Sequence, residues 1–252
     1  MIRNALALSC ALLLSCGPKP PPQEPEPEPE TDPEPETQPA DELQVVGLTG
    51  SLSQSEVNGT MESKAIPAFN LCFQYYLEEN EFLFGDLKLG LKVQPSGKVS
   101  EVTLVHSSYG DYELEQCFVG KSKFLKFPKP HGGGTEVTYD FSTDVLPGVQ
   151  SPEEGSTIKL KNALAPFQSE IKKCLGGKNA GYSVTFYLGD SMSEEVENEK
   201  GKLVTKTLSR VLTLGGHGPD GSRDGLECLF DASKSWKLAM DVDGVRKVTL
   251  EL

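Results

Sequence analysis

The sequence predicts an α+β fold of two tandem modules. Each module has the element order α-β-β-α-β, with two helices on one face of a small antiparallel sheet. Two observations support this. A helix-period pattern ending on a cysteine is followed by an alternating strand pattern, first around Cys72 and again around Cys174. A second cysteine then follows each of them, Cys117 after 45 residues and Cys228 after 54.

The first module is predicted over residues 47–147. Its opening helix carries apolar side chains at helical spacing, at Val57, Met61, Ala65, Phe69, Cys72 and Tyr76. Pro67 interrupts this pattern, so the helix is kinked there or begins there. Period-two alternation then predicts three strands. The first contains Leu87, Leu89, Leu91 and Val93, the second lies around Val102 and Leu104 after the turn 95–98, and the third contains Val137, Tyr139 and Phe141. The short helix bearing Cys117 lies before the last strand.

The second module, residues 148–252, is predicted as a divergent copy of the first. Its helix has apolar positions at Leu164, Phe167, Ile171 and Cys174 and is interrupted by Pro166. Three strands are predicted after it: the first at Tyr182, Val184, Phe186 and Leu188; the second at Leu208, Val211 and Leu214; and the third at Val248, Leu250 and Leu252. The last three positions share one offset, 111 residues, with the closing strand of the first module and with the second cysteines. The second copy is nine residues longer between its cysteines, and the acidic stretch 191–202 is interpreted as an inserted loop.

The first fifteen residues have the features of an export signal. Arg3 is followed by an uncharged apolar stretch that is too short to span a bilayer. The stretch ends in Leu13-Leu14-Ser15-Cys16, which resembles the bacterial lipobox, so Cys16 is predicted to be the lipidated first residue of the mature chain. An ordinary secretory signal with an incidental cysteine is the alternative. Gly17 after the cysteine, rather than Asp, favours the outer membrane on its periplasmic side.

Residues 16–46 are predicted to be a disordered acidic tether. Residues 17–46 contain nine acidic residues against Lys19 alone, out of a formal net charge of −13 for the whole chain. Proline alternates with glutamate here, and proline-rich charged segments are extended spacers without a packed core. No basic face typical of nucleic-acid binding is present.

Four cysteines remain after the signal and the lipidated residue are set aside. An exported chain enters an oxidising compartment, where an even number of cysteines predicts disulfides. Spacing alone does not give the connectivity, but the internal repeat predicts Cys72–Cys117 and Cys174–Cys228. A single larger domain with crossed disulfides is the alternative.

Residues 47–143 carry a series of short motifs in a specific order and spacing. They are Gly50-Ser51-Leu52-Ser53, Glu56-Val57, Cys72-Phe73, Gly85, Pro95-Ser96-Gly97-Lys98-Val99, Ser107-Ser108-Tyr109-Gly110-Asp111, Glu115-Gln116-Cys117, Phe127-Pro128-Lys129-Pro130, Gly132-Gly133-Gly134 and Val137-Thr138-Tyr139-Asp140-Phe141. Together they resemble the C-terminal domain of the myxobacterial AgmX/PglI proteins, a branch of the TonB C-terminal-like domains. Asp140 departs from the family, which usually has proline there. The second module keeps only Cys174, Cys228, Trp236 and the closing strand.

The resemblance implies a protein-binding adaptor. TonB-like domains bind extended peptides by adding a strand to a sheet edge, which uses unpaired main-chain groups. The edge implied here contains Val137, Tyr139 and Phe141, and the implied partners are envelope proteins of transport or motility machinery. Family members are usually anchored by an inner-membrane helix, whereas this chain has a lipid signal, which suits a docking role better than energy coupling.

No catalytic, cofactor or metal site is predicted. His131-Gly132-Gly133-Gly134 imitates an esterase oxyanion motif, but no GxSxG nucleophile elbow accompanies it. His106 and His217 have no ligand spacing. Residues 220–231 echo a calcium loop, although Glu227 and Asp231 depart from its pattern, so a turn and helix start are preferred there. The prediction is a non-enzymatic interaction lipoprotein, and the alternative is a lipoprotein that binds calcium or another small ligand.

Overall fold

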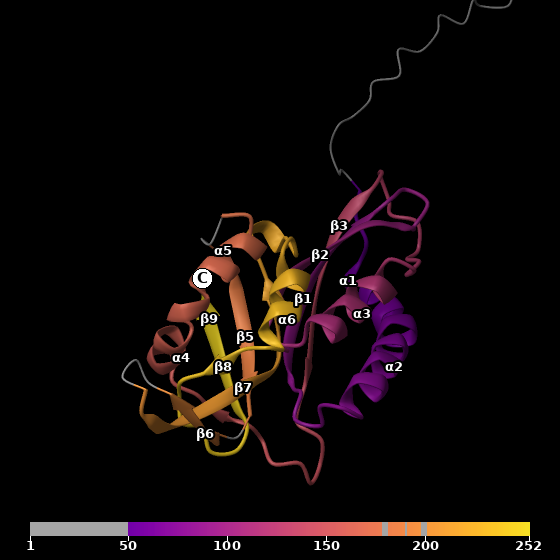
Figure 1. Ribbon diagram of the computed structural model, residues 1–252. Coiled ribbons are helices and arrows are strands. Elements are labelled where there is room, and N and C mark those ends of the chain that lie inside the picture. The colour runs from indigo at the N-terminus through magenta and orange to yellow at the C-terminus, as the bar shows by residue number, and fades with distance from the viewer. Residues whose placement is uncertain (1–49, 178–180, 190, 198–200) are drawn as a thin grey trace, which may run out of the picture. The chain divides into compact units, whose positions relative to one another are not determined.

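The computed structural model describes residues 50–177, 181–189, 191–197 and 201–252 (Figure 1). The predicted signal peptide, Cys16 and the acidic tether lie outside these residues. The α+β class is confirmed, because helices and antiparallel strands alternate along the described chain. We call residues 50–147 the first half and residues 148–252 the second half.

The first half opens with one continuous helical stretch. It consists of α1 (Gln54–Thr60), the π-helical turn η1 (Met61–Ala65) and α2 (Ile66–Leu77). The hydroxyl of Ser53 accepts a hydrogen bond from the Glu56 amide, and the Glu56 carboxylate accepts one from the Ser53 amide, which completes a capping box. Pro67 lies in the first turn of α2, where its missing N–H is tolerated. The predicted interruption is therefore a π-helical turn inside a continuous helix.

A three-stranded antiparallel sheet supports these helices. Its order is β2-β1-β3, from β1 (Gly85–Val93), β2 (Val99–Ser107) and β3 (Thr135–Thr143), with α3 (Tyr112–Ser122) between β2 and β3. Alternate β1 residues, Leu87, Leu89, Leu91 and Val93, are buried in one core together with Phe69 and Phe118 from the helices. The helices therefore cover one face of the sheet, as the alternation predicts.

The second half repeats this order of strands and adds to it. The central strands run β9-β5-β7, from β5 (Ser183–Leu188), β7 (Leu203–His217) and β9 (Arg246–Glu251). The helical segments before β5 are α4 (Thr157–Ala163), the 3-10 turn η2 (Ala165–Phe167) and α5 (Gln168–Cys174). Those after β7 are the 3-10 turn η3 (Pro219–Gly221) and α6 (Leu226–Ser233). Short strands β4 (Glu153–Glu154) and β8 (Lys237–Leu238) pair with β9 and β7. The β4–β9 pair is parallel, so this sheet is larger than predicted and not purely antiparallel.

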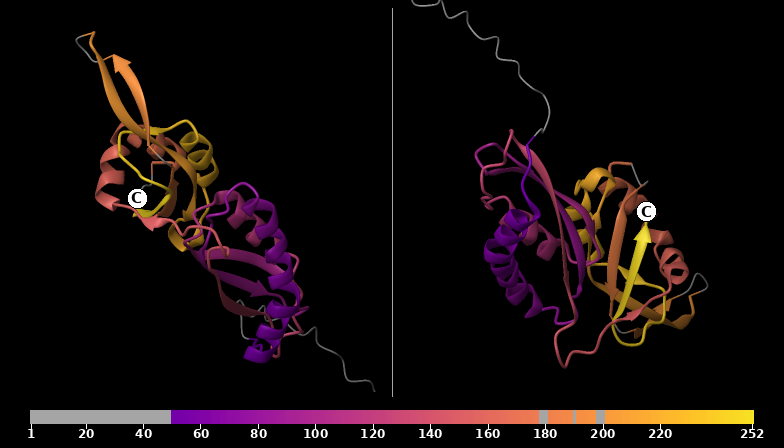
Figure 2. Two further views of the ribbon diagram at one scale, coloured as in Figure 1. Left: turned by 90° about the horizontal axis from the view of Figure 1, so that it is seen from below. Right: turned by 180° about the vertical axis from the view of Figure 1, so that it is seen from behind.

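The acidic stretch 191–202 is not the inserted loop that the sequence suggested. It contains β6 (Met192–Glu197), which pairs antiparallel with the first part of β7 and forms a projecting hairpin (Figure 2). Glu194 lies opposite Lys206 in the pairing, and Lys237 contacts the Glu194 carboxylate at 2.8 Å. These positive charges offset the repulsion that made an acidic strand improbable from sequence.

Both predicted disulfides are present. Cys72–Cys117 joins α2 to α3, with the two Cα atoms 5.9 Å apart, and Cys174–Cys228 joins α5 to α6 at 5.4 Å. Each therefore links the two helical segments that cover one sheet. Disulfides of this kind are typical of chains that fold in an oxidising compartment.

The two halves belong to one compact unit, residues 46–252. Each half contributes a tyrosine to the core of the other, because Tyr112 of α3 is buried in the core of the second half and Tyr187 of β5 in the core of the first. The hydroxyl of Tyr187 donates to the Phe84 carbonyl at 3.1 Å. The sequence predicts two modules but gives no sign that each buries a tyrosine in the core of the other.

Candidate functional site

Strand β3 forms an edge of the first sheet. It pairs with β1 over its full length, from Thr135 opposite Val93 to Thr143 opposite Gly85. Among the described residues no strand pairs with its other side. Gly50 and Ser51 pair only with the residues just before β3, at Gly134 and His131. The edge therefore offers main-chain donors and acceptors that another strand can use.

The three residues predicted for this edge lie in β3, but their side chains point inward. Val137 is buried, and Tyr139 and Phe141 are half-buried against the core. The ring of Phe141 lies 5.3 Å from that of Phe69 and 5.9 Å from that of Phe118. These side chains hold the strand in place, so its available groups are the main chain and the outward side chains.

The corresponding edge of the second half is partly occupied. The β4 residues Glu153 and Glu154 pair with Arg246 and Lys247 of β9, and the Gly155 amide donates to the Lys247 carbonyl at 2.9 Å. An ion pair between Arg246 and Glu153 adds to this contact. The two edges are thus equivalent in strand order but differ in accessibility.

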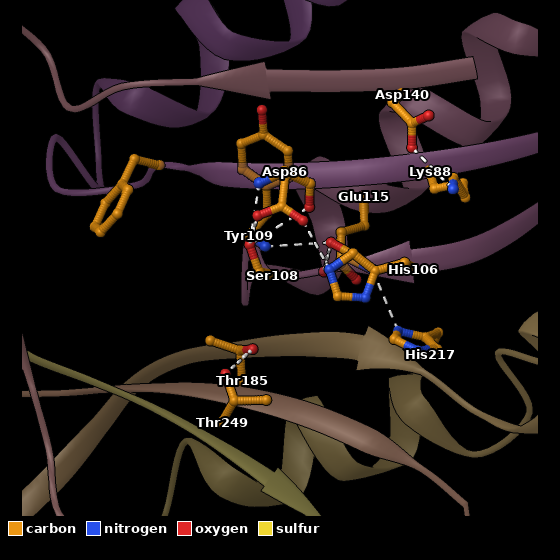
Figure 3. A network of polar contacts seen from close by, with 12 residues as sticks. Asp86, Lys88, His106, Ser108, Tyr109, Glu115, Asp140, Thr185, His217 and Thr249 are labelled. Atoms are coloured by element: carbon orange, nitrogen blue, oxygen red, sulfur yellow. Dashed lines mark hydrogen bonds and ion pairs between the residues drawn. The ribbon is translucent and has the colours of Figure 1, made fainter.

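A buried polar network around Glu115, which Figure 3 labels, joins the halves at the end of β2. Glu115 of α3 is wholly buried, and its carboxylate accepts hydrogen bonds from the Ser107 hydroxyl at 2.7 Å, the Gly216 amide at 2.8 Å and the Arg223 guanidinium at 2.8 Å. Burial raises the pKa of Glu115, and the positive charge of Arg223 opposes that shift. Arg223 also donates to the Tyr112 carbonyl at 3.1 Å. The network fixes α3 against the end of β7.

Asp111 makes a second buried connection between the halves. Its side chain caps α3 by accepting a hydrogen bond from the Leu114 amide at 2.8 Å. Its other oxygen accepts a hydrogen bond from the Thr213 hydroxyl of β7 at 2.9 Å. Burial raises the pKa of Asp111, and these two donors oppose the shift. The helix cap is therefore also an inter-half contact.

Asp86, His106 and Ser108 gather at the same junction but do not form a nucleophilic triad. The Asp86 carboxylate contacts His106 Nε2 at 2.7 Å and accepts a hydrogen bond from the Ser108 hydroxyl at 2.8 Å, so it lies between them (Figure 3). In a triad the imidazole stands between the carboxylate and the hydroxyl and takes the proton of the hydroxyl. Here the imidazole makes no hydrogen bond with Ser108.

His217 packs beside this group. Its ring centroid lies 5.3 Å from that of His106, and its Nδ1 accepts a hydrogen bond from the Ser107 amide at 3.2 Å. Burial lowers the pKa of His217, and the neighbouring His106 lowers it further. A neutral His217 is therefore favoured, consistent with its role as an acceptor for the main chain of β2.

The esterase-like motif at His131 lies in a turn. The main chain of His131 pairs with Ser51, and a Cβ atom on Gly50 would lie 2.2 Å from the Gly133 carbonyl oxygen. This approach requires glycine at position 50. The glycines 132–134 therefore belong to the crossing of two chain segments at the start of β3.

The calcium-like segment 220–231 forms a turn and the start of α6 instead of a binding loop. Asp231, its last candidate ligand, lies in α6 and pairs with Lys234 at 3.0 Å. Within the described ranges no group of three or more His, Cys, Asp or Glu side chains could hold a metal ion. Ser222 and Asp224 instead line a pocket of about 430 Å³ beside Tyr182 and Cys174.

Sequence reasoning missed the residues that join the halves, namely Glu115, Arg223, Tyr187 and Lys247. Lys247 of β9 donates to the Phe84 carbonyl at 2.8 Å and lies 4.0 Å from the centre of the Phe84 ring. No local pattern distinguishes these residues from surface charges or core aromatics. Their roles depend on contacts more than 100 positions apart in the chain.

Comparisons with protein-family models, with curated proteins and with solved structures gave no match to this chain. No helix in the described part of the chain is long and apolar enough to cross a membrane. The family resemblance, the lipid anchor and the envelope location are therefore taken up below as proposals.

Proposed function

We propose that this chain is a non-enzymatic envelope lipoprotein whose first half binds an extended segment of a partner protein by strand addition to β3. The observation that carries the proposal is the contrast between two equivalent edges. The edge at β9 is partly covered by β4, at Arg246 and Lys247, whereas β3 pairs on one side only among the described residues. A bound strand would continue the ladder of the first sheet.

The chemistry of β3 supports a partner that is recognised mainly through its main chain. The core-facing residues are fixed by packing, while Glu136, Thr138, Asp140 and Ser142 are exposed. Asp140 pairs with Lys88 at 3.3 Å, a contact that leaves its side chain 74% exposed. Main-chain pairing provides affinity, and this mildly acidic rim selects among partner side chains.

The cellular setting follows from the N-terminal sequence and the disulfides. A lipid on Cys16, followed by an acidic tether over residues 16–46, would attach the folded unit to an outer membrane, facing the periplasm. In this setting the partners are envelope proteins. The similarity of residues 47–143 to the AgmX/PglI C-terminal domain points to transport or motility machinery.

Site-specific photo-crosslinking tests the strand-addition site. A photoreactive residue replaces Thr138 in β3 or, as a matched control, Thr249 in β9, which is also an exposed threonine and stands at the corresponding position 111 residues later. Peptides selected by display against the purified protein serve as probes. Crosslinking at 138 and not at 249 is expected, and equal crosslinking at both positions or at neither contradicts the proposal.

A small-ligand role is the second candidate. The pocket lined by Tyr182, Ser222 and Asp224 favours it, because a hydroxyl, a carboxylate and an aromatic ring there surround one concave space of about 430 Å³. Calcium is the ligand that the sequence suggested for this region, although no group of three or more His, Cys, Asp or Glu side chains among the described residues could hold it. Isothermal titration with calcium tests this directly. If calcium produces no heat and no shift in the melting temperature, calcium binding is ruled out.

A further inference from the structure

The segment that follows α3 exposes positive charge and one aromatic ring in an otherwise acidic protein. Phe124 is 88% exposed, the highest fraction among the large hydrophobic side chains of the described residues. Its neighbours Leu125 and Phe127 are buried and fix the segment on the first core. The exposed ring is therefore held on a rigid support.

Six lysines belong to this segment or contact its main chain. Lys121, Lys123, Lys126 and Lys129 are exposed along the same segment. The Lys64 ammonium donates to the Lys126 carbonyl at 2.8 Å, and Lys98 forms a β-bridge with Lys126, which adds two more positive charges. Within the described residues none of the six forms an ion pair with a carboxylate. We call these six lysines together with Phe124 the basic patch.

An acidic side chain beside the basic patch does not neutralise it. Glu56 borders the same surface depression as Lys64 and Lys126. Its carboxylate is already used in the capping box with Ser53, whose amide and hydroxyl both donate to it. The local surface thus stays positive, although the whole chain has a net charge of −13.

We propose that the basic patch docks the folded unit onto an anionic lipid surface. Lysines near such a surface each strengthen binding about fivefold, and an exposed aromatic ring among them can enter the interface between headgroups and acyl chains. Phe124 favours a membrane over an acidic polypeptide, because pairing with carboxylates alone needs no free apolar ring.

The position of the basic patch in the fold agrees with this occupant. The described chain begins at Gly50, and Ser51 pairs with His131, two residues after Lys129. A chain anchored upstream of Gly50 therefore enters the folded unit beside the basic patch. The free edge of β3 begins at Thr135, so docking and strand addition use neighbouring but separate groups.

Vesicle co-sedimentation tests the proposal. The mature chain, which starts at position 16 and carries Cys16→Ser so that it has no acylation site there, is mixed with phosphatidylcholine vesicles with or without phosphatidylglycerol. Binding is expected only to the anionic vesicles and is expected to weaken as salt is raised. Lys123→Glu combined with Lys126→Glu should weaken it by about 25-fold or more, and Phe124→Ala by about tenfold.

Matched controls come from the second half. Lys172→Glu with Lys173→Glu changes two exposed lysines outside the basic patch, and Ile158→Ala removes an apolar side chain that is 73% exposed. These variants should bind as the parent does. Equal losses in patch and control variants, or no preference for anionic vesicles, would overturn the proposal. Binding to poly-glutamate but not to anionic vesicles would also overturn it, in favour of an acidic polypeptide.

Discussion

The carboxylate of Glu115 in α3 and the guanidinium of Arg223 before α6 lie 2.8 Å apart and join the two halves of the folded unit. The Glu115 side chain is fully buried and that of Arg223 is 11% exposed. Arg223 also stacks on Tyr112, 4.7 Å from its ring centre. This pair lies inside a network that includes both the main chain and side chains of each half.

Removing Arg223 should destabilise the protein strongly. Arg223→Met leaves the buried carboxylate of Glu115 without its charged partner, and such a loss costs about 3–5 kcal/mol in the free energy of unfolding. Urea denaturation measures it. The control is Lys234→Met, which breaks the exposed pair with Asp231 and should cost less than about 1 kcal/mol. Similar effects of the two substitutions would show that the junction contributes little.

Each disulfide should contribute to the stability of the whole unit. Cys72→Ser with Cys117→Ser opens a loop of 45 residues, and Cys174→Ser with Cys228→Ser opens one of 54. The loop-entropy relation gives about 4 kcal/mol for each. Because the halves share buried residues, each double variant should shift one common unfolding transition in denaturant. Two separate transitions would mean that the halves unfold independently.

Lys247 should titrate well below an ordinary lysine. Burial lowers its pKa from 10.5 to about 8. Between these values the unfolded chain binds more protons than the folded one, so the free energy of unfolding rises with pH across this window. NMR titration of the lysine side chains should give a midpoint near 8 for Lys247. Lys247→Met should flatten the rise in stability, whereas Lys172→Met should leave it unchanged, and an ordinary midpoint for Lys247 would contradict the burial argument.

Periodicity and the internal repeat predicted much of the fold. The spacing of Val57, Met61, Ala65 and Phe69 predicted the helix face that is buried, and the aligned cysteines predicted both disulfides. These features depend on local spacing, which a single sequence displays directly. The edge strand through Val137, Tyr139 and Phe141 was also placed correctly, although the resemblance did not show that these side chains face the core.

The junction and the added strands were not predictable in the same way. Glu115 stands between Leu114 and Gln116, and nothing local marks it as buried, since its partners Gly216 and Arg223 lie about 100 positions away. Strand β6 was mistaken for a loop because glutamates disfavour strands, and the compensating Lys237 comes from a distant segment. Long-range pairing of charges overrode local propensity in both cases.

Amide NMR on the complex with a display-selected peptide tests strand addition to β3 most directly. The account predicts that alternate β3 amides, those pointing away from β1, shift and gain protection from hydrogen exchange when the peptide binds, while the amides of β9 do not change. Peptides that bind without affecting β3, or that protect β9 equally, would contradict it.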